Sequence, residues 1–125
     1  MRVTGSAVSL NVADPEASAD FVRTHLGFTE EMSADGFVSL GHPEVGFNLA
    51  FLRVGLATFT PARIAGPAGQ GLLLAFVVDD LDAQFARIRD AGARVVTPPQ
   101  TEPWGERFCQ FEDPNGIVWQ LVQWV

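Results

Sequence analysis

The stretch AVSLNVADPEASADFVRTHLGF (residues 7–28) decides the fold, because its strand and helix signals recur later in the chain. Apolar residues alternate with small or polar ones over residues 7–12, which is typical of a half-buried strand. Asp14 then supplies an N-cap, Pro15 suits the first helical position, and Gly27 is placed to end the helix. The stretch therefore predicts a strand followed directly by a capped helix.

The same pattern begins again in LLLAFVVDDLDAQFARIRDAG (residues 72–92). An apolar strand over residues 72–78 precedes Asp80, a second predicted N-cap, and Gly92 is placed to end the second helix. Every residue of this second strand is apolar, so we expect both of its faces to be covered. The strand and cap signals of the two halves are 66 positions apart. A shared period of this kind indicates a duplicated unit.

Each predicted helix is followed by about three strands, so each half is a βαβββ module. A linker rich in proline and glycine separates the halves, and a strand over residues 93–97 is predicted to stop at Pro98-Pro99. The fold class is α+β: one domain, 1–125, of two modules at about 1–58 and 72–125, joined by linker 59–71. The other strands are predicted over residues 28–32, 36–40, 47–54, 107–112 and 117–124.

Composition narrows the possible partners. The net charge is −7 and the chain has no lysine, so nucleic acid is not expected as a partner. The acidity suits a cationic ligand, although it also serves solubility alone, which is the commoner reason. No apolar stretch is long enough to span a bilayer, and no secretory signal is recognised. The single cysteine, Cys109, fits a reducing compartment, so we expect a cytoplasmic protein.

The two halves and one late motif resemble a known family. Gly105-Glu106-Arg107 is followed after five residues by Asp113-Pro114-Asn115-Gly116 and a final strand. Together with the repeat, this resembles the vicinal oxygen chelate superfamily of glyoxalase I, extradiol dioxygenases, fosfomycin-resistance transferases and bleomycin-resistance binding proteins. The resemblance covers nearly the whole chain. It implies two βαβββ modules that form a cupped, mostly antiparallel mixed sheet around a cavity.

The enzymes of this superfamily hold a divalent metal on the cupped strands. The resemblance places three of the ligand positions at Ala7, Leu73 and Gln120, and the matching strand of the first half runs through residues 48–50 without carboxylate or imidazole. Alkyl groups cannot bind a metal, and an amide is a poor neutral ligand. We therefore expect no metal and no cofactor. The two histidines, His25 and His42, lie near a helix end and in a turn.

The predicted binding residues follow from strand parity and from one exposed aromatic. Residues 7, 9 and 11 of the first strand, and 73, 75 and 77 of its counterpart, should face the cavity. Trp104, in a Pro/Gly loop, is placed to stack on a planar or cationic ligand, or else to pack at a dimer interface. Arg107 could neutralise an acidic ligand group, or pair with a neighbouring Glu106 or Glu112. The predicted ligand-binding set is Trp104, Phe108, Phe51, Gln120, Asn11, Ser9 and Arg107.

These observations favour binding over catalysis. The first hypothesis is a metal-independent homodimer that sequesters a hydrophobic or aromatic small molecule, which could also be cationic. This role is similar to that of the metal-free drug-binding and antibiotic-resistance members of the superfamily. The alternatives are a glyoxalase- or dioxygenase-like enzyme with atypical or no metal ligands, and an accessory dimer without a small ligand. No catalytic residue is assigned. Cys109 is interpreted as a core residue, Asp80 as a helix cap and Asp79 as a solvated loop residue.

Overall fold

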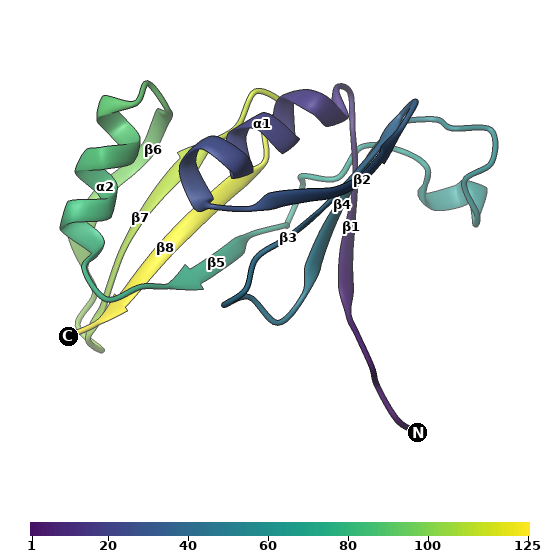
Figure 1. The fold of residues 1–125 in the computed structure, drawn as a ribbon. Helices are drawn as coiled ribbons and strands as arrows, with labels where there is room; N and C mark the ends of the chain where they lie inside the picture. The colour runs from purple at the N-terminus through teal and green to yellow at the C-terminus, as the bar shows by residue number, and fades with distance from the viewer. The chain divides into compact units, whose positions relative to one another are not determined.

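The computed structural model describes residues 1–125, which form two compact units, Met1–Ala68 and Gly69–Val125. Each unit contains a strand, a helix and three further strands (Figure 1). Each has one four-stranded mixed sheet, and neither sheet closes into a barrel. The prediction of an α+β chain built from two βαβββ modules is therefore confirmed. No helix combines the length and apolar character needed to cross a membrane.

In unit 1 the first strand pairs with the last one of the module. The strand order is β1-β4-β3-β2, with β1 parallel to β4 and the other pairs antiparallel. A parallel neighbour requires a long crossover connection, and here α1, β2 and β3 supply it. The elements are β1 (Ala7–Val12), α1 (Pro15–Leu26), β2 (Thr29–Ala34), β3 (Phe37–Gly41), β4 (Asn48–Arg53) and the short 3-10 helix η1 (Ala62–Ile64).

Unit 2 repeats this topology. Its strand order is β5-β8-β7-β6, with β5 parallel to β8 and the other pairs antiparallel. The order matches that of unit 1 position by position, which is the duplication that the repeat predicts. The elements are β5 (Leu74–Val77), α2 (Leu81–Asp90), β6 (Arg94–Thr101), β7 (Glu106–Glu112) and β8 (Val118–Trp124).

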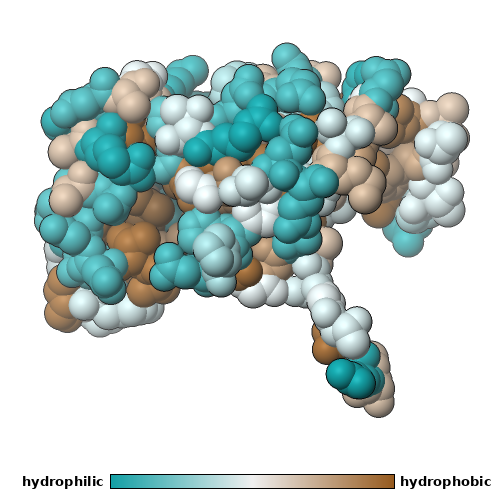
Figure 2. All heavy atoms as spheres, viewed as in Figure 1, coloured by the Kyte–Doolittle hydropathy of each residue, from teal (hydrophilic) through white to brown (hydrophobic).

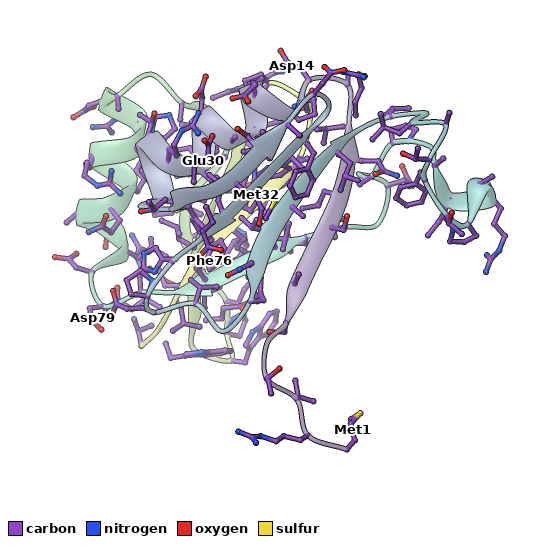
Figure 3. All side chains as sticks on the ribbon, turned by 45° about the vertical axis from the view of Figure 1, so that its right-hand side comes forward. Met1, Asp14, Glu30, Met32, Phe76 and Asp79 are labelled. Carbon is purple, nitrogen blue, oxygen red and sulfur yellow. The ribbon has the colours of Figure 1, made fainter.

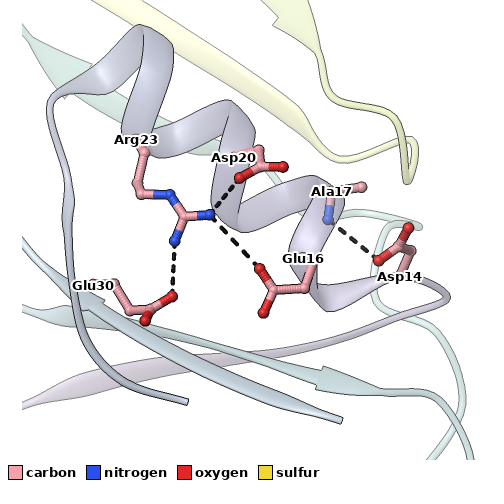
Figure 4. Close-up of polar contacts among 6 residues, drawn as sticks. All are labelled: Asp14, Glu16, Ala17, Asp20, Arg23 and Glu30. Atoms are coloured by element: carbon pink, nitrogen blue, oxygen red, sulfur yellow. Dashed lines mark hydrogen bonds and ion pairs between the residues drawn. The ribbon is translucent and has the colours of Figure 1, made fainter. Parts of the chain in front are cut away.

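Both helices begin at the predicted aspartates. The Ala17 N–H donates to Asp14 Oδ1 over 3.3 Å (Figure 4), and the Ala83 N–H donates to Asp80 Oδ1 over 3.2 Å. Gly27 ends α1 with a left-handed φ of 74°, which costs a glycine nothing. After α2, which ends at Asp90, Gly92 takes the corresponding positive φ. The capping predictions are therefore confirmed.

One face of each sheet packs on its helix, and side-chain contacts identify that face. Glu30 of β2 pairs with Arg23 of α1 (Figure 4), so Leu40, which is opposite Glu30, also faces the helix. In unit 2, Gln123 Oε1 accepts from the Leu81 N–H at the start of α2 over 3.0 Å. Alternation then assigns the remaining residues. The fully or almost fully buried apolar residues on these faces include Leu10, Val38, Leu49, Phe51, Cys109, Phe111, Trp119 and Leu121.

Strand β6 corrects the prediction that Pro98-Pro99 stops a strand. The strand continues to Thr101 through both prolines. It lies at the edge of its sheet, and its pairing with β7 shifts register between Val95 and Thr97 and between Thr97 and Gln100. An edge strand with bulges can carry prolines, because the missing N–H groups belong to positions outside the ladder.

Strand β5 is shorter than predicted and is covered on one face only. It spans Leu74–Val77, with Leu74 buried. Leu73 and Val77 point to the other side and are 49% and 68% exposed. The prediction that both faces of this strand are covered is therefore wrong for the chain by itself. The apolar sequence of this strand correctly predicts that its helix side is buried. On the other side, the apolar side chains lie at the surface.

Part of the segment predicted as a linker is anchored on unit 1. The Ala68 N–H donates to the Asn11 carbonyl over 2.8 Å, and Asn11 Nδ2 donates to the Ile64 carbonyl over 3.1 Å. The Gly55 N–H donates to the Ala65 carbonyl over 3.0 Å. Residues 55–68 therefore begin after β4 and return to the end of β1, where hydrogen bonds hold them. Their prolines and glycines are compatible with a segment fixed by backbone hydrogen bonds, which a composition signal cannot distinguish from a free linker.

The last hairpin of each unit is closed by a side chain that accepts from the N–H two residues ahead. In unit 1, His42 Nδ1 accepts from the Glu44 N–H over 3.0 Å. In unit 2, Asp113 Oδ1 accepts from the Asn115 N–H over 2.9 Å and from the Ile117 N–H over 3.0 Å. Asp113 Oδ2 also accepts from Trp119 Nε1 over 3.2 Å, and the residue is only 4% exposed. Asp113 thus holds both the turn and the first core residues of β8.

We expect Asp113→Ala to lower the free energy of unfolding by about 2–3 kcal/mol, because it leaves the buried Trp119 and Ile117 N–H groups without acceptors. Asp113→Asn, which keeps one acceptor, should cost less. Asp79→Asn, at an exposed position, is the matched control and should change the value by under about 0.5 kcal/mol. Urea denaturation measures all three. Equal midpoints for Asp113→Ala and the control would contradict this assignment.

Candidate functional site

The helix-free face of the unit 2 sheet carries a chain of hydrogen-bonded polar side chains. We define this face by the residues that alternate with the helix-side ones, among them Ala75, Val77, Thr97, Phe108, Gln110, Gln120 and Val122. Thr97 Oγ1 donates to Gln110 Oε1 over 2.7 Å, and Gln110 Nε2 donates to Gln120 Oε1 over 2.8 Å. Three adjacent strands contribute one residue each. The chain ends at Gln120 Nε2, an uncharged donor.

An apolar row lies directly beside this polar chain. Val77, Val122 and Phe108 are paired across β5, β8 and β7, two residues along from Ala75, Gln120 and Gln110. Phe108 is half-buried, Val122 is buried and Val77 is exposed. The face therefore presents a polar row of uncharged amides next to an aromatic and aliphatic row, which is the combination found in small-molecule sites.

Two tryptophans lie at the end of the same sheet. Trp104 is in the turn between β6 and β7 and is 66% exposed, and Trp124 ends β8 opposite Glu106 and is 60% exposed. The Val125 N–H donates to the carbonyl of the adjacent Gly105 over 2.9 Å, so the turn lies against the end of the chain. Hydrophobic residues are visible at the surface near the C-terminus (Figure 2). Trp104 is thus an exposed aromatic, as the sequence predicts for either a ligand contact or an interface.

Arg107 does not lie on this face. Its guanidinium makes a bidentate ion pair with Asp82 of α2, over 2.7 and 3.1 Å, and Nη1 donates to Thr101 Oγ1 over 3.0 Å. The prediction of Glu106 or Glu112 as its ion-pair partner is therefore wrong. The Asp82 carboxylate raises the pKa of Arg107, and Arg107 lowers the pKa of Asp82. The ion pair connects α2 with β7. The alternation of side chains along β7 does not predict this long-range contact.

Unit 1 separates the three residues predicted for its binding face. Ser9 is exposed on the helix-free face of β1, opposite Ala50. Asn11 points the same way but is only 7% exposed, and its amide holds the Ile64 carbonyl. Phe51 is fully buried on the helix side, so its ring belongs to the core of the unit. The strand parity of β4 would have identified this, because Leu49 and Phe51 share one face.

A carboxylate that the sequence analysis missed lies on the helix-free face of unit 1. Glu31 Oε2 accepts from Asn48 Nδ2 over 3.0 Å. Glu31 lies in a bulge of β2 between Glu30 and Met32, the two residues that flank it and are labelled in Figure 3. A bulge places two consecutive side chains opposite a single partner residue, so simple alternation fails there. No sequence signal marks this bulge.

A family model described as the Glyoxalase/Bleomycin resistance protein/Dioxygenase superfamily matches residues 6–121, almost the entire chain. The chain belongs to this superfamily. Solved structures agree with the assignment. A glyoxalase/bleomycin resistance protein/dioxygenase from Nocardioides is 30% identical, with a TM-score of 0.80 over 100% of this chain and 85% of that one.

Two further solved structures are similar to this chain over essentially its whole length. TnmS3 from Streptomyces sp. CB03234, described as an antibiotic binding protein, is 27% identical with a TM-score of 0.76, covering 100% of this chain and 99% of that one. TioX from Micromonospora sp. ML1 has a TM-score of 0.80 at 23% identity, covering 98% and 100%, and so shares the fold.

The curated relatives are larger proteins. Uncharacterized proteins of Mycobacterium bovis and Mycobacterium tuberculosis are each 36% identical over 66 residues, which is 53% of this chain. The match covers 41% of the first protein and 37% of the second. The chain therefore matches less than half of the length of the curated relatives.

The side chains at the three positions where the resemblance predicts metal ligands do not fit a divalent ion. Ala7 and Leu73 offer alkyl groups only. The Gln120 side chain could bind a metal only through its amide oxygen. This oxygen already accepts a hydrogen bond from Gln110 Nε2. His42 is engaged with the Glu44 N–H, and no group of three or more His, Cys, Asp or Glu side chains gathers anywhere in the chain. Divalent metals prefer carboxylate, imidazole or thiolate donors, which these positions do not supply.

Cys109 is buried in the helix-side core of unit 2, as the sequence predicts. Burial raises the pKa of its thiol from 9.0 to about 11. Because the thiolate is the reactive form, this environment suppresses nucleophilic chemistry. The residue contributes packing.

The Cys109 thiol should be inert in the folded protein. At pH 8 we expect no reaction with Ellman's reagent until urea unfolds the chain, whereupon one thiol reacts. The unfolded thiol ionises near pH 9 and the folded one near pH 11, so the free energy of unfolding should fall as the pH rises through this range. Rapid labelling of the native protein at pH 8 would show that the thiol is accessible.

Proposed function

We propose that the protein binds a hydrophobic or aromatic small molecule without a metal ion. The observation that carries this proposal is the Thr97–Gln110–Gln120 hydrogen-bond chain. At a position where the resemblance predicts a charged metal ligand, the chain has the amide of Gln120, and the oxygen of this amide already accepts a hydrogen bond from Gln110. A binding surface made of neutral amides and apolar side chains supplies orientation and contact area, and it offers no general acid, base or nucleophile.

The chemistry of the unit 2 face specifies the ligand further. Half-buried Phe108 and exposed Val77 provide apolar contact, which favours a planar, weakly polar ring system. Gln120 Nε2 has no acceptor in the structure, so it favours a carbonyl or similar oxygen on that ring. Trp104, exposed at the end of the sheet, adds a second aromatic surface. A polycyclic aromatic compound with ring carbonyls combines these features.

The relatives support a sequestering role. TnmS3, whose description names it an antibiotic binding protein, is 27% identical over essentially the full length of both chains. We therefore propose an antibiotic-like ligand and a role in retaining it, with a cytoplasmic homodimer as the working form. The exposed apolar side chains of Val77 and Trp124 are compatible with such an association.

Metal independence is the first test. Doxorubicin, a planar antibiotic with ring carbonyls, serves as the probe, and quenching of the three tryptophans, all in unit 2, reports binding. The dissociation constant should stay the same after treatment with EDTA and removal of the chelator, because the site contributes no metal ligand. A stoichiometric metal in the purified protein, or binding that requires one, would instead favour the enzyme alternative.

The binding surface is the second test. Phe108→Ala and Trp104→Ala should each weaken binding of the same probe by about 3–10-fold, the range expected for loss of one aromatic contact. Ile64→Ala removes an exposed apolar side chain from unit 1 and is the matched control, for which we expect no change. Calorimetry measures the constants, because Trp104→Ala also alters the fluorescence signal. Unchanged binding by Trp104→Ala would remove that residue from the site.

A further inference from the structure

Glu31 is the only carboxylate that the structure holds across the helix-free face of unit 1. It reaches from β2 over Gly41 of β3 to Asn48 of β4. Asn48 Nδ2 fixes one carboxylate oxygen, and the other, Oε1, makes no hydrogen bond. The side chain is therefore oriented and still has an acceptor available.

Gly41 creates the space for this carboxylate. A Cβ atom at position 41 would lie 2.4 Å from Glu31 Oε1, which is far inside van der Waals contact. Gly41 does not have the positive φ that would require glycine for backbone reasons. The missing side chain is thus explained by the close approach of Glu31. The bulge, the glycine and the amide are three separate features of three strands that together position one negative group.

Glu31 has no counter-charge. The other carboxylates beside the unit 1 sheet pair with arginines: Glu30 with Arg23, and Asp35 with Arg53. Glu31 forms no ion pair, although it is held in place. The nearby surface is formed by small residues opposite one another, Ser9 and Ala50, and by the 64% exposed side chain of Met32. A planar cation can therefore approach the carboxylate and rest on an apolar neighbour.

We propose that Glu31, on the helix-free face of unit 1, binds the cationic group of a small molecule, an ammonium or an amidinium, through a charge-assisted hydrogen bond to Oε1. This inference goes beyond the proposed function, because it concerns unit 1 by itself, and its ligand class is an aromatic compound that carries a basic nitrogen. A positioned carboxylate gives stronger and more directional binding than a mobile one, because its side-chain entropy is already lost. The net charge of −7 also attracts positively charged ligands.

The test uses a matched pair of probes, benzamidine, which is charged at pH 7, and benzamide, its neutral near-isostere. Two-dimensional ¹H–¹⁵N NMR of the full chain follows the side-chain amides of Asn48, Gln110 and Gln120 as separate reporters. We expect benzamidine to shift the Asn48 amide with saturation, and benzamide to leave it unshifted at equal concentration. Added salt should weaken the benzamidine effect.

Two variants separate charge from position. Glu31→Gln removes the charge, and Gly41→Ala keeps the charge but displaces the carboxylate from its position over Gly41. Each should weaken benzamidine binding by about three- to fivefold, the range for an exposed charge-assisted pair. Glu16→Gln removes one charge from α1, on the other side of the sheet, and should bind benzamidine like the unaltered protein. Thermal melting checks that all three variants fold.

The outcomes distinguish this inference from the proposed function. No Asn48 shift with benzamidine, or equal binding by Glu31→Gln, Gly41→Ala and Glu16→Gln, overturns the role of Glu31. If doxorubicin still binds in that case, the proposed function stands without it. If benzamidine binds at Asn48 as expected but doxorubicin fails to bind with any variant, the cation site stands and the proposed aromatic surface of unit 2 fails.

Discussion

The buried carboxylate of Asp113 is the interaction on which the candidate site depends. Its two oxygens accept three N–H groups, from the backbone of Asn115 and Ile117 and from the ring of Trp119. These bonds close the turn and fix where β8 begins relative to β7. The register that follows puts Gln110 directly opposite Gln120. A slip of β8 by one residue would turn Gln120 toward the helix side of the sheet, where an unpaired amide is costly.

The two units share a scaffold and differ on the faces that the scaffold leaves free. Each has a helix-capping aspartate, a parallel pair of outer and inner strands, and a hairpin closed by a side-chain acceptor, His42 or Asp113. On the helix-free faces, unit 2 presents the amides that end at Gln120, and unit 1 presents the carboxylate of Glu31. Duplication has thus kept the groups that build the fold while the helix-free faces have diverged.

Neutral amides and one unpaired carboxylate suit recognition better than catalysis. An amide oxygen that already accepts a hydrogen bond has little affinity left for a metal ion, and it does not transfer protons near neutral pH. The thiol of Cys109 is equally unreactive, since burial raises its pKa to about 11. The helix-free faces thus carry uncharged amides and one carboxylate, in a chain that belongs to the Glyoxalase/Bleomycin resistance protein/Dioxygenase superfamily.

The sequence alone determined the module, because caps, strand alternation and helix-ending glycines act through neighbours within a few residues. It also has an amide, Gln120, at a position where the resemblance predicts a metal ligand. Tertiary structure decided where side chains from different elements meet: Arg107 with Asp82, and Glu31 with Asn48. It also carried β6 through Pro98-Pro99. These features depend on strand order, bulges and edge positions, which arise from pairing between distant segments and leave no periodic trace in the chain.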